Sequence, residues 1–174
     1  MKSFISEDNI EQAICNRLSQ PEYGWKRIEC SPELEDQDEV ASTGRANASE
    51  CILPEVFLSA LRRLNPQIDD EILKNILQDF RKDYSGTDMV DTNYKFYNQI
   101  RNGIKVKTRN QHREDFDIVK LIDFDHPERN DFHCVNQMWI KGHFRYRRPD
   151  VLLFVNGLPV VFIELKNSTV KIEE

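Results

Sequence analysis

The pattern of hydrophobic and polar positions changes near Gly103. Before this residue, apolar side chains recur every three or four positions, as on one face of an amphipathic helix. After it, they alternate with polar residues or form short continuous runs, which is typical of strands. The pattern therefore predicts helices first and a sheet afterwards, in an α/β or α+β domain.

Four helices are predicted before the change of period. Ser6 is a suitable N-cap for a helix from Glu7 to about Ser19, and Asp69 for a third helix. Pro54 is favoured in the first turn of the second. A shorter helical pattern covers residues 92–100. Between the first two helices, residues 31–50 are rich in Glu, Asp, Ser and Ala, and we expect them to be irregular or a long exposed loop.

The strand patterns predict a central mixed sheet of about five strands, flanked by helices. The last two apolar runs are joined by Asn156-Gly157, a strong signal for a type I′ hairpin because both residues accept positive φ. Their continuously apolar character favours strands that are covered on both faces. The predicted strands are residues 104–107, 116–122, 132–140, 151–155 and 160–163.

Charged residues stand at the open end of this predicted hairpin. Asp150 precedes it and Glu164-Leu165-Lys166 follows it. Side chains alternate faces along a strand, so Glu164 and Lys166 should project to one side, with Asp150 returned to their vicinity. Carboxylates are ligands for Mg²⁺, and the lysine could deprotonate an attacking water or neutralise negative charge in the reaction. The alternative is an ordinary surface ion pair worth about 0–1 kcal/mol.

These residues carry a resemblance to a known family. Arg148-Pro149-Asp150-Val151, together with residues 161–167, resembles the PD-(D/E)xK nuclease motif. In its particular residues, the motif most resembles that of the restriction (R) subunit of Type I restriction–modification enzymes. Ile10-Glu11, Gly24-Trp25 and residues 93–107 and 116–119 also resemble the amino-terminal region of that subunit.

The resemblance implies a restriction-endonuclease-like α/β fold, with a Mg²⁺-dependent site at a sheet end that cuts duplex DNA. It implies catalytic roles for Asp150, Glu164 and Lys166, and metal ligation by Asp150, Glu164 and the backbone carbonyl of Leu165. A helix glutamate often joins such sites, and Glu11 matches that position. The alternative for Glu11 is a solvated residue on an amphipathic helix.

The chain departs from the R subunit in extent. The subunit continues into an ATP-driven motor, whereas this sequence stops at Glu174 and contains neither a Gly-x-x-x-x-Gly-Lys-Ser/Thr loop nor a Gln-x-x-x-Tyr element after the last strand. We therefore expect residues 1–174 to form one nuclease domain, an amino-terminal fragment that does not itself bind ATP. The resemblance implies duplex DNA, the motor domain and the modification and specificity subunits as partners.

Two alternatives remain open at this point. One is a catalytically silent docking module of the same fold, and the other is a nuclease of a different DNA-processing system. The intact trio of Asp150, Glu164 and Lys166 favours catalysis, because a docking surface does not need it.

Charge and composition refine these expectations. The net charge of −6 has the wrong sign for a chain that holds DNA unaided. Basic residues gather, however, at positions 101–113 and 141–148, and we expect the latter run, with Arg145, Arg147 and Arg148, to contact DNA beside the site; the alternative is a solvated loop. The cysteines form no Cys-x-x-Cys pair. No apolar stretch could span a bilayer, so we expect a soluble, cytoplasmic protein.

Overall fold

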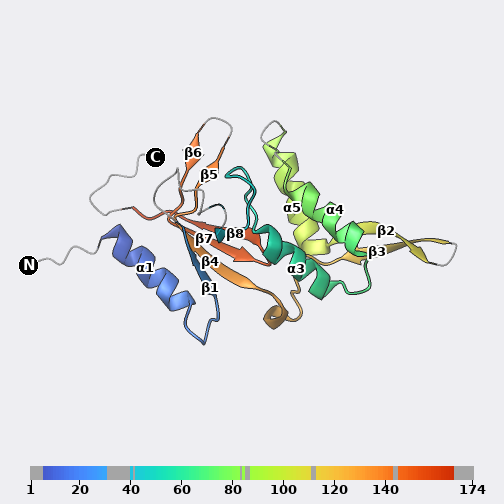
Figure 1. Ribbon diagram of the computed structural model, residues 1–174, viewed down its shortest axis with the longest axis horizontal. Helices are drawn as coiled ribbons and strands as arrows, with labels where there is room; N and C mark the ends of the chain where they lie inside the picture. The colour runs from blue at the N-terminus through green and yellow to red at the C-terminus, as the bar shows by residue number, and fades with distance from the viewer. Residues whose placement is uncertain are drawn as a thin grey trace, which may run out of the picture.

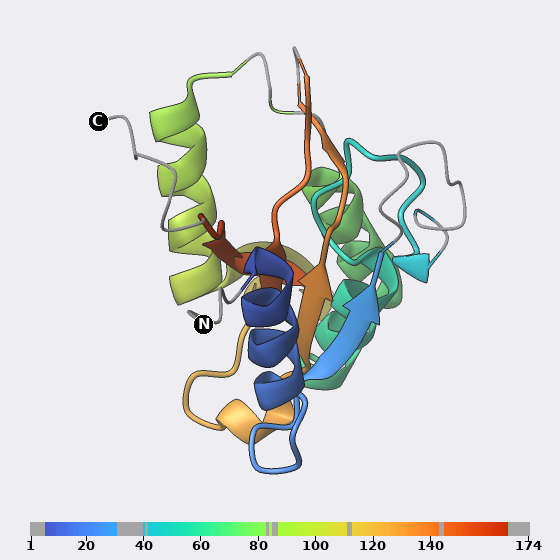
Figure 2. The same ribbon diagram turned by 90° about the vertical axis from the view of Figure 1, so that its left-hand side faces the viewer.

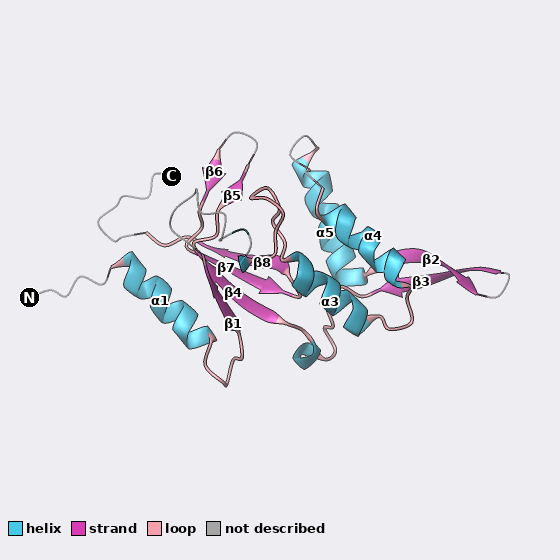
Figure 3. Cartoon of the chain, viewed as in Figure 1, coloured by secondary structure: helices cyan, strands magenta, loops and turns pink. Residues whose placement is uncertain are grey.

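A computed structural model of the chain describes residues 6–30, 40, 42–82, 84, 87–110, 113–142 and 145–166 (Figure 1). All four predicted helices are present in it (Figure 3). Ser6 and Asp69 accept hydrogen bonds from backbone amides of the first turn, as expected. Asp88 does the same, so the last helix starts before the expected Thr92. The helices are α1 (Glu7–Leu18), α3 (Pro54–Leu64), α4 (Asp70–Phe80) and α5 (Met89–Asn102).

A mixed, four-stranded sheet forms the centre, with strand order β1-β4-β7-β8. The first two strands are parallel, and the remaining neighbours are antiparallel. The expected α/β architecture is therefore confirmed. The first strand escaped prediction because Ile28 is its only apolar residue. The strands are β1 (Lys26–Glu29), β4 (Phe132–Asn136), β7 (Val151–Val155) and β8 (Leu158–Ile163).

Two of the predicted strands lie outside the central sheet, so its expected composition was wrong. β2 (Ile104–Asn110) and β3 (Arg113–Val119) pair only with each other, as an antiparallel ribbon. Ile104, Val106 and Val119 pack into a hydrophobic cluster with α3, α4 and Leu158 at the start of β8, so the ribbon joins the core through side chains and not through strand pairing. Figure 1 shows it extending from the end of the molecule opposite to α1.

The predicted strand 132–140 is interrupted. It ends as β4 at Asn136, where Gln137 adopts a positive φ of 60°. The chain resumes as β5 (Ile140–Lys141), which pairs with β6 (Tyr146–Arg147) in a small separate sheet. A short 3₁₀ helix, η1 (Pro127–Arg129), precedes β4.

Helices cover both faces of the central sheet, with α1 on one side and α3 and α4 on the other (Figure 2). On the α1 side, Cys15 packs against Cys134 and Val151. On the other side lie buried residues from the α3 end, β4 and β7, namely Leu53, Val135, Met138, Leu152 and Phe154. Strand β7 is thus covered on both faces, as its apolar run predicted.

Strand β8 contradicts the same prediction. Val160, Val161 and Phe162 are 42%, 43% and 61% exposed. The reason is topological: β8 is an edge strand of the sheet, and within the described residues only β7 pairs with it. An apolar run therefore marked a strand correctly but not its burial.

The turn between β7 and β8 is the predicted two-residue hairpin. Asn156 and Gly157 have positive φ values of 51° and 79°. Gly157 lies directly against α3, because a Cβ there would come within 2.6 Å of the Leu53 oxygen and 2.8 Å of the Phe57 nitrogen. The carbonyl of Gly157 also accepts a hydrogen bond of 2.9 Å from the Leu53 amide. The turn is therefore fixed to the start of the helix.

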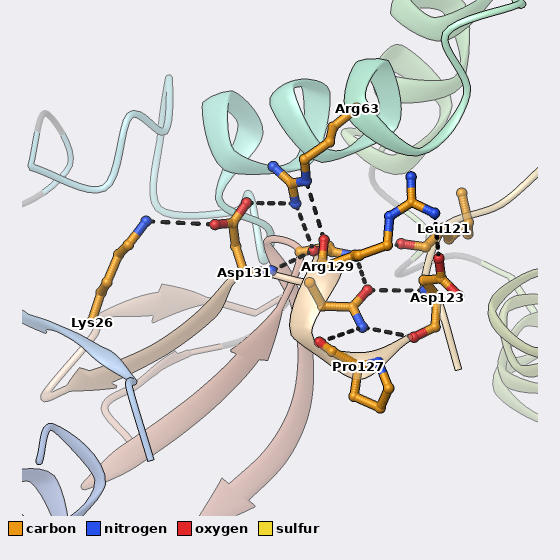
Figure 4. A network of polar contacts seen from close by, with 9 residues as sticks. Lys26, Arg63, Leu121, Asp123, Pro127, Arg129 and Asp131 are labelled. Atoms are coloured by element: carbon orange, nitrogen blue, oxygen red, sulfur yellow. Dashed lines mark hydrogen bonds and ion pairs between the residues drawn. The ribbon is translucent and has the colours of Figure 1, made fainter. Parts of the chain in front are cut away.

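Asn156 fastens the same turn to the segment before β4. Its buried side chain donates to the Leu121 carbonyl at 2.9 Å and accepts from the Asp131 amide at 2.8 Å. Asp131 in turn pairs with Arg63 of α3 and Lys26 of β1 (Figure 4). These contacts hold the closed end of the hairpin in place.

The segment expected to be an exposed loop is only partly described, since residues 31–39 and 41 lie outside the described ranges. Residues 43–50 are irregular, as expected, but Thr43, Arg45 and Glu50 are buried. The Arg45 guanidinium donates to the carbonyls of Glu50 and Trp139, so its burial is matched by hydrogen bonds. Among the described helices, none has the length and apolar character needed to cross a membrane.

Candidate active site

Asp150 lies beside the segment that follows β8. The last paired positions of the hairpin are Val151 and Ile163, and Asp150 and Glu164 adjoin them at the end away from the turn. The amide of Leu165 donates a 2.5 Å hydrogen bond to Oδ2 of Asp150. The fold therefore brings Asp150 and residues 164–166 together, as the hairpin pattern predicted.

Lys166 is paired with Glu164. Its Nζ lies 2.9 Å from Oε1 of Glu164, and both side chains are about half exposed. The hydrogen bond to Glu164 raises the pKa of Lys166 above its usual value, and the charges of Glu164, Glu7 and Asp150 act in the same direction. Lys166 is thus a stable ammonium group at neutral pH, surrounded by carboxylates. The proximity of Glu7, in the first turn of α1, was not predicted from the sequence.

Glu11 of α1 is buried, with only 4% of its surface exposed, so the solvated alternative was wrong. Its Oε1 accepts a 2.9 Å hydrogen bond from Nδ2 of Asn136, and its Oε2 accepts one from Nε2 of Gln137. Both donors are neutral amides, and Glu11 makes no ion pair with any described residue. Its burial and these two donors hold the carboxylate in a fixed orientation.

Gln137 connects Glu11 to Asp150. Its side chain donates to Glu11, and its backbone amide donates a 3.1 Å hydrogen bond to the Asp150 carbonyl. The sequence analysis did not single out Asn136 or Gln137. The signal in the sequence was the pair of amide residues Asn136-Gln137, directly after the apolar residues of β4. Asn136 pairs with Val151, so this pair lies at the same sheet end as Asp150.

Arg145, Arg147 and Arg148 lead directly into Asp150 and are all exposed. They belong to β6 and its flanks, in the small β5–β6 hairpin that rises from the sheet end where β7 begins (Figure 1). The Arg148 guanidinium lies over the Trp139 ring, 5.1 Å from its centroid, which stabilises the base of this hairpin. These three residues therefore directly precede the candidate site along the chain.

The basic run at 101–113 is elsewhere. Its residues begin at the end of α5 and continue along the β2–β3 ribbon, at the opposite end of the molecule's long axis (Figure 1). This run therefore does not lie beside the candidate site. His112 and His143 lie outside the described residues.

The described residues contain no group of three or more His, Cys, Asp or Glu side chains that is arranged to hold a metal ion. Mg²⁺ does not require such a cluster, because it binds through one or two carboxylates and keeps several waters. Asp150 and Glu164 offer that donor set, and Glu11 offers a further carboxylate that Gln137 links to the Asp150 backbone. The residues present thus fit a Mg²⁺ ion in their chemistry.

A mixed sheet with helices on both faces and charged hairpin ends defines a restriction-endonuclease-like α/β domain. Comparison with known sequences then identifies the family. The profile described as "Type I restriction enzyme R protein N terminus (HSDR_N)" matches residues 4–174, so the chain belongs to this family of amino-terminal R protein domains.

Named relatives agree with the family. The chain is 32% identical over 165 residues to the Type I restriction enzyme HindI endonuclease subunit of Haemophilus influenzae. It is 29% identical over 171 residues to the putative Type I restriction enzyme MjaIXP endonuclease subunit of Methanocaldococcus jannaschii. Each match covers 94% of this chain but only 15% of the relative. The chain therefore corresponds to a small part of these subunits.

Proposed function

We propose that this chain is the Mg²⁺-dependent endonuclease domain of a Type I restriction enzyme R subunit and that it hydrolyses phosphodiester bonds of duplex DNA. The observation that carries the proposal is the convergence of Asp150, Glu164 and Lys166 at the open end of the β7–β8 hairpin, fixed by the hydrogen bond from Leu165 to Asp150. Family membership supports the assignment to a restriction system.

In this proposal, Asp150, Glu164 and the backbone carbonyl of Leu165 hold Mg²⁺. The bound ion would lower the pKa of a water molecule and offset negative charge on the scissile phosphate. Glu11 contributes a further negative charge from α1. Because both of its oxygens are held by amides, this carboxylate is oriented before any metal binds.

Lys166 then acts through its positive charge. The two roles suggested by the sequence were deprotonation of water and neutralisation of charge. We favour the second, because a lysine side chain is ordinarily an ammonium group at neutral pH and cannot then accept a proton. Placed beside the scissile phosphate, Lys166 would stabilise the additional negative charge that develops as water attacks.

Arg145, Arg147 and Arg148 would orient the DNA. Guanidinium groups bind phosphate oxygens in a bidentate manner, and the exposed β5–β6 hairpin presents them next to Asp150. With a net charge of −6, the chain has limited intrinsic affinity for DNA, so these contacts position the backbone rather than supply tight binding.

The remaining assignments concern the parent enzyme. We propose that the motor domain of the same polypeptide, together with modification and specificity subunits, brings DNA to this domain in the cytoplasm. ATP would be used by that motor and not bound by this chain. The coverage of only 15% of the relatives is consistent with such further parts.

A second candidate function is a catalytically silent docking module of the same fold. It is favoured by the ion pair between Glu164 and Lys166, because Glu164, a predicted metal ligand, is already bound to another side chain. The two candidates differ in one measurable property, because only the nuclease requires a metal at Asp150.

Calorimetric titration with Mg²⁺ tests the proposal. We expect the chain to bind the ion and Asp150→Ala to lose at least about 90% of the affinity, because one of two carboxylates is removed. Asp125→Ala, at an exposed aspartate in the segment before β4, is the matched control and should bind Mg²⁺ normally. Unchanged binding by Asp150→Ala would exclude the assigned metal site and favour the docking module.

A further inference from the structure

Gln137 has a backbone conformation that is unusual for its residue type. Its φ of 60° lies in the left-handed region, which Gly, Asn and Asp tolerate better than Gln does. The residue stands where β4 ends and the chain turns toward β5. Residues held in such conformations are often found at functional sites, where surrounding contacts maintain them.

The contacts of Gln137 explain why this conformation is kept. Its side-chain amide reaches α1 and donates to Oε2 of Glu11, whereas its backbone amide donates to the carbonyl of Asp150. A single residue thus joins a helix carboxylate to the start of β7. Asn136 holds only the other oxygen of Glu11, at 2.9 Å.

We infer that Gln137 is a positioning residue that fixes the Glu11 carboxylate relative to Asp150. The inference rests on the proposed function and deepens it, since it names a residue outside the motif that shapes the metal site. Gln137 does not itself bind the metal in this scheme. It acts through Glu11, whose buried carboxylate accepts from the side-chain amides of Asn136 and Gln137 and is oriented by them.

Substitution by glycine provides the first test. Gln137→Gly accepts a φ of 60° without strain and removes the whole side chain, including the amide that holds Glu11. Loss of a partner that orients a metal-site group typically weakens metal affinity by about 10- to 100-fold. We therefore expect Mn²⁺, measured by electron paramagnetic resonance on the folded variant, to bind the chain at least about 10-fold more weakly.

A double-mutant cycle tests whether the effect runs through Glu11. In a Glu11→Gln background, Gln137→Gly should change Mn²⁺ affinity by less than about twofold, because the group that it positions has lost its charge. A loss of the same size in both backgrounds would overturn the inference. An Mn²⁺ affinity of Gln137→Gly within about twofold of that of the original chain would also overturn the inference.

Gln137→Asn is the second variant. Asparagine tolerates the left-handed conformation and keeps an amide, but is one methylene shorter, so it should recover part of the affinity lost in Gln137→Gly. If Gln137→Asn bound Mn²⁺ no more tightly than Gln137→Gly, the inference would be wrong. Gln67→Gly makes the same chemical change at an exposed turn and should leave Mn²⁺ binding unaltered.

Failure of this inference can be told apart from failure of the proposed function. Asp150→Ala addresses the metal site itself. If Asp150→Ala abolishes Mn²⁺ binding while Gln137→Gly retains it, only the positioning role is excluded. If both variants bind Mn²⁺ normally, the metal site is wrong, and with it the basis of the inference.

Discussion

The backbone amide of Leu165 and the carboxylate of Asp150 are joined by a hydrogen bond of 2.5 Å. This contact ties the two halves of the motif together across the end of the hairpin, with Asp150 one residue and Leu165 two residues beyond the last paired strand positions. It also places the carboxylate where Glu164 and Lys166 emerge from β8. The separation of the motif residues is therefore set by the backbone, before any metal or DNA is bound.

Removal of the Lys166 ammonium group should abolish most DNA cleavage. We expect Lys166→Ala to lower the cleavage rate by about 100-fold or more, which is the usual size of a lost catalytic contact of this kind. The assay is plasmid cleavage by a complete R subunit that carries this domain, together with its partner subunits. Lys120→Ala, at an exposed lysine near the end of β3, should cleave at the normal rate. Normal cleavage by Lys166→Ala would exclude the assigned site.

Loss of a guanidinium on the β5–β6 hairpin should weaken DNA binding in a salt-dependent way. If Arg147 contacts one phosphate, Arg147→Ala should reduce the slope of log affinity against log salt by about 0.9. Fluorescence anisotropy with a labelled duplex at several salt concentrations measures this slope. Lys105→Ala, on the distant β2–β3 ribbon, is the control, and an equal effect there would contradict a specific role for the hairpin.

A methyl group at the tip of the main hairpin should destabilise the fold. Gly157→Ala combines an unfavourable positive φ with close contacts to Leu53 and Phe57, so we expect a loss of about 3 kcal/mol or more in the free energy of unfolding. Gly24→Ala is a matched control, because Gly24 also has positive φ but has open space around it. It should cost about 1 kcal/mol. Equal urea midpoints for the two variants would contradict the packing argument.

The buried imidazole of His133 should make stability depend on pH. Burial, with a contribution from Lys26, lowers its pKa below the usual 6.5. The unfolded chain therefore binds a proton at a higher pH than the folded chain does, and this group stabilises the fold above pH 6.5 and less so as the pH falls below it.

Urea unfolding between pH 7 and pH 5 measures this dependence. We expect His133→Leu to show a smaller loss of stability on acidification than the original chain. The exposed His126 provides the comparison, since His126→Gln should retain the full dependence. An identical pH profile for His133→Leu would show that the burial of this ring does not control it.

The sequence predicted the helices and the hairpin because their signals are local. Ser6 and Asp69 cap helices through their own first turns, and Asn156-Gly157 specifies a turn by its backbone preferences alone. The position of Asp150 beside residues 164–166 followed from that turn and from strand alternation. These features require no knowledge of distant parts of the chain.

The remaining errors concern long-range packing. The apolar residues of β8 gave no sign that this strand would lie at the sheet edge, and those of β2 and β3 did not reveal that their partner would be the helical cluster. Glu11 could equally have faced solvent, since its burial depends on Asn136 and Gln137, more than a hundred positions away. Such contacts leave no mark in local periodicity.

Within the described part of the chain, the β7–β8 hairpin is anchored at its turn and along β7, but not along β8. Asn156 and Gly157 clamp its closed end to α3 and to the loop before β4, while Asp150 and Glu164 stand at the other end. Because β7 also pairs with β4 along its whole length, the hairpin cannot tilt independently of the sheet. A loosened turn would instead free the edge strand β8, so substitutions around Asn156 should let Glu164 shift relative to Asp150.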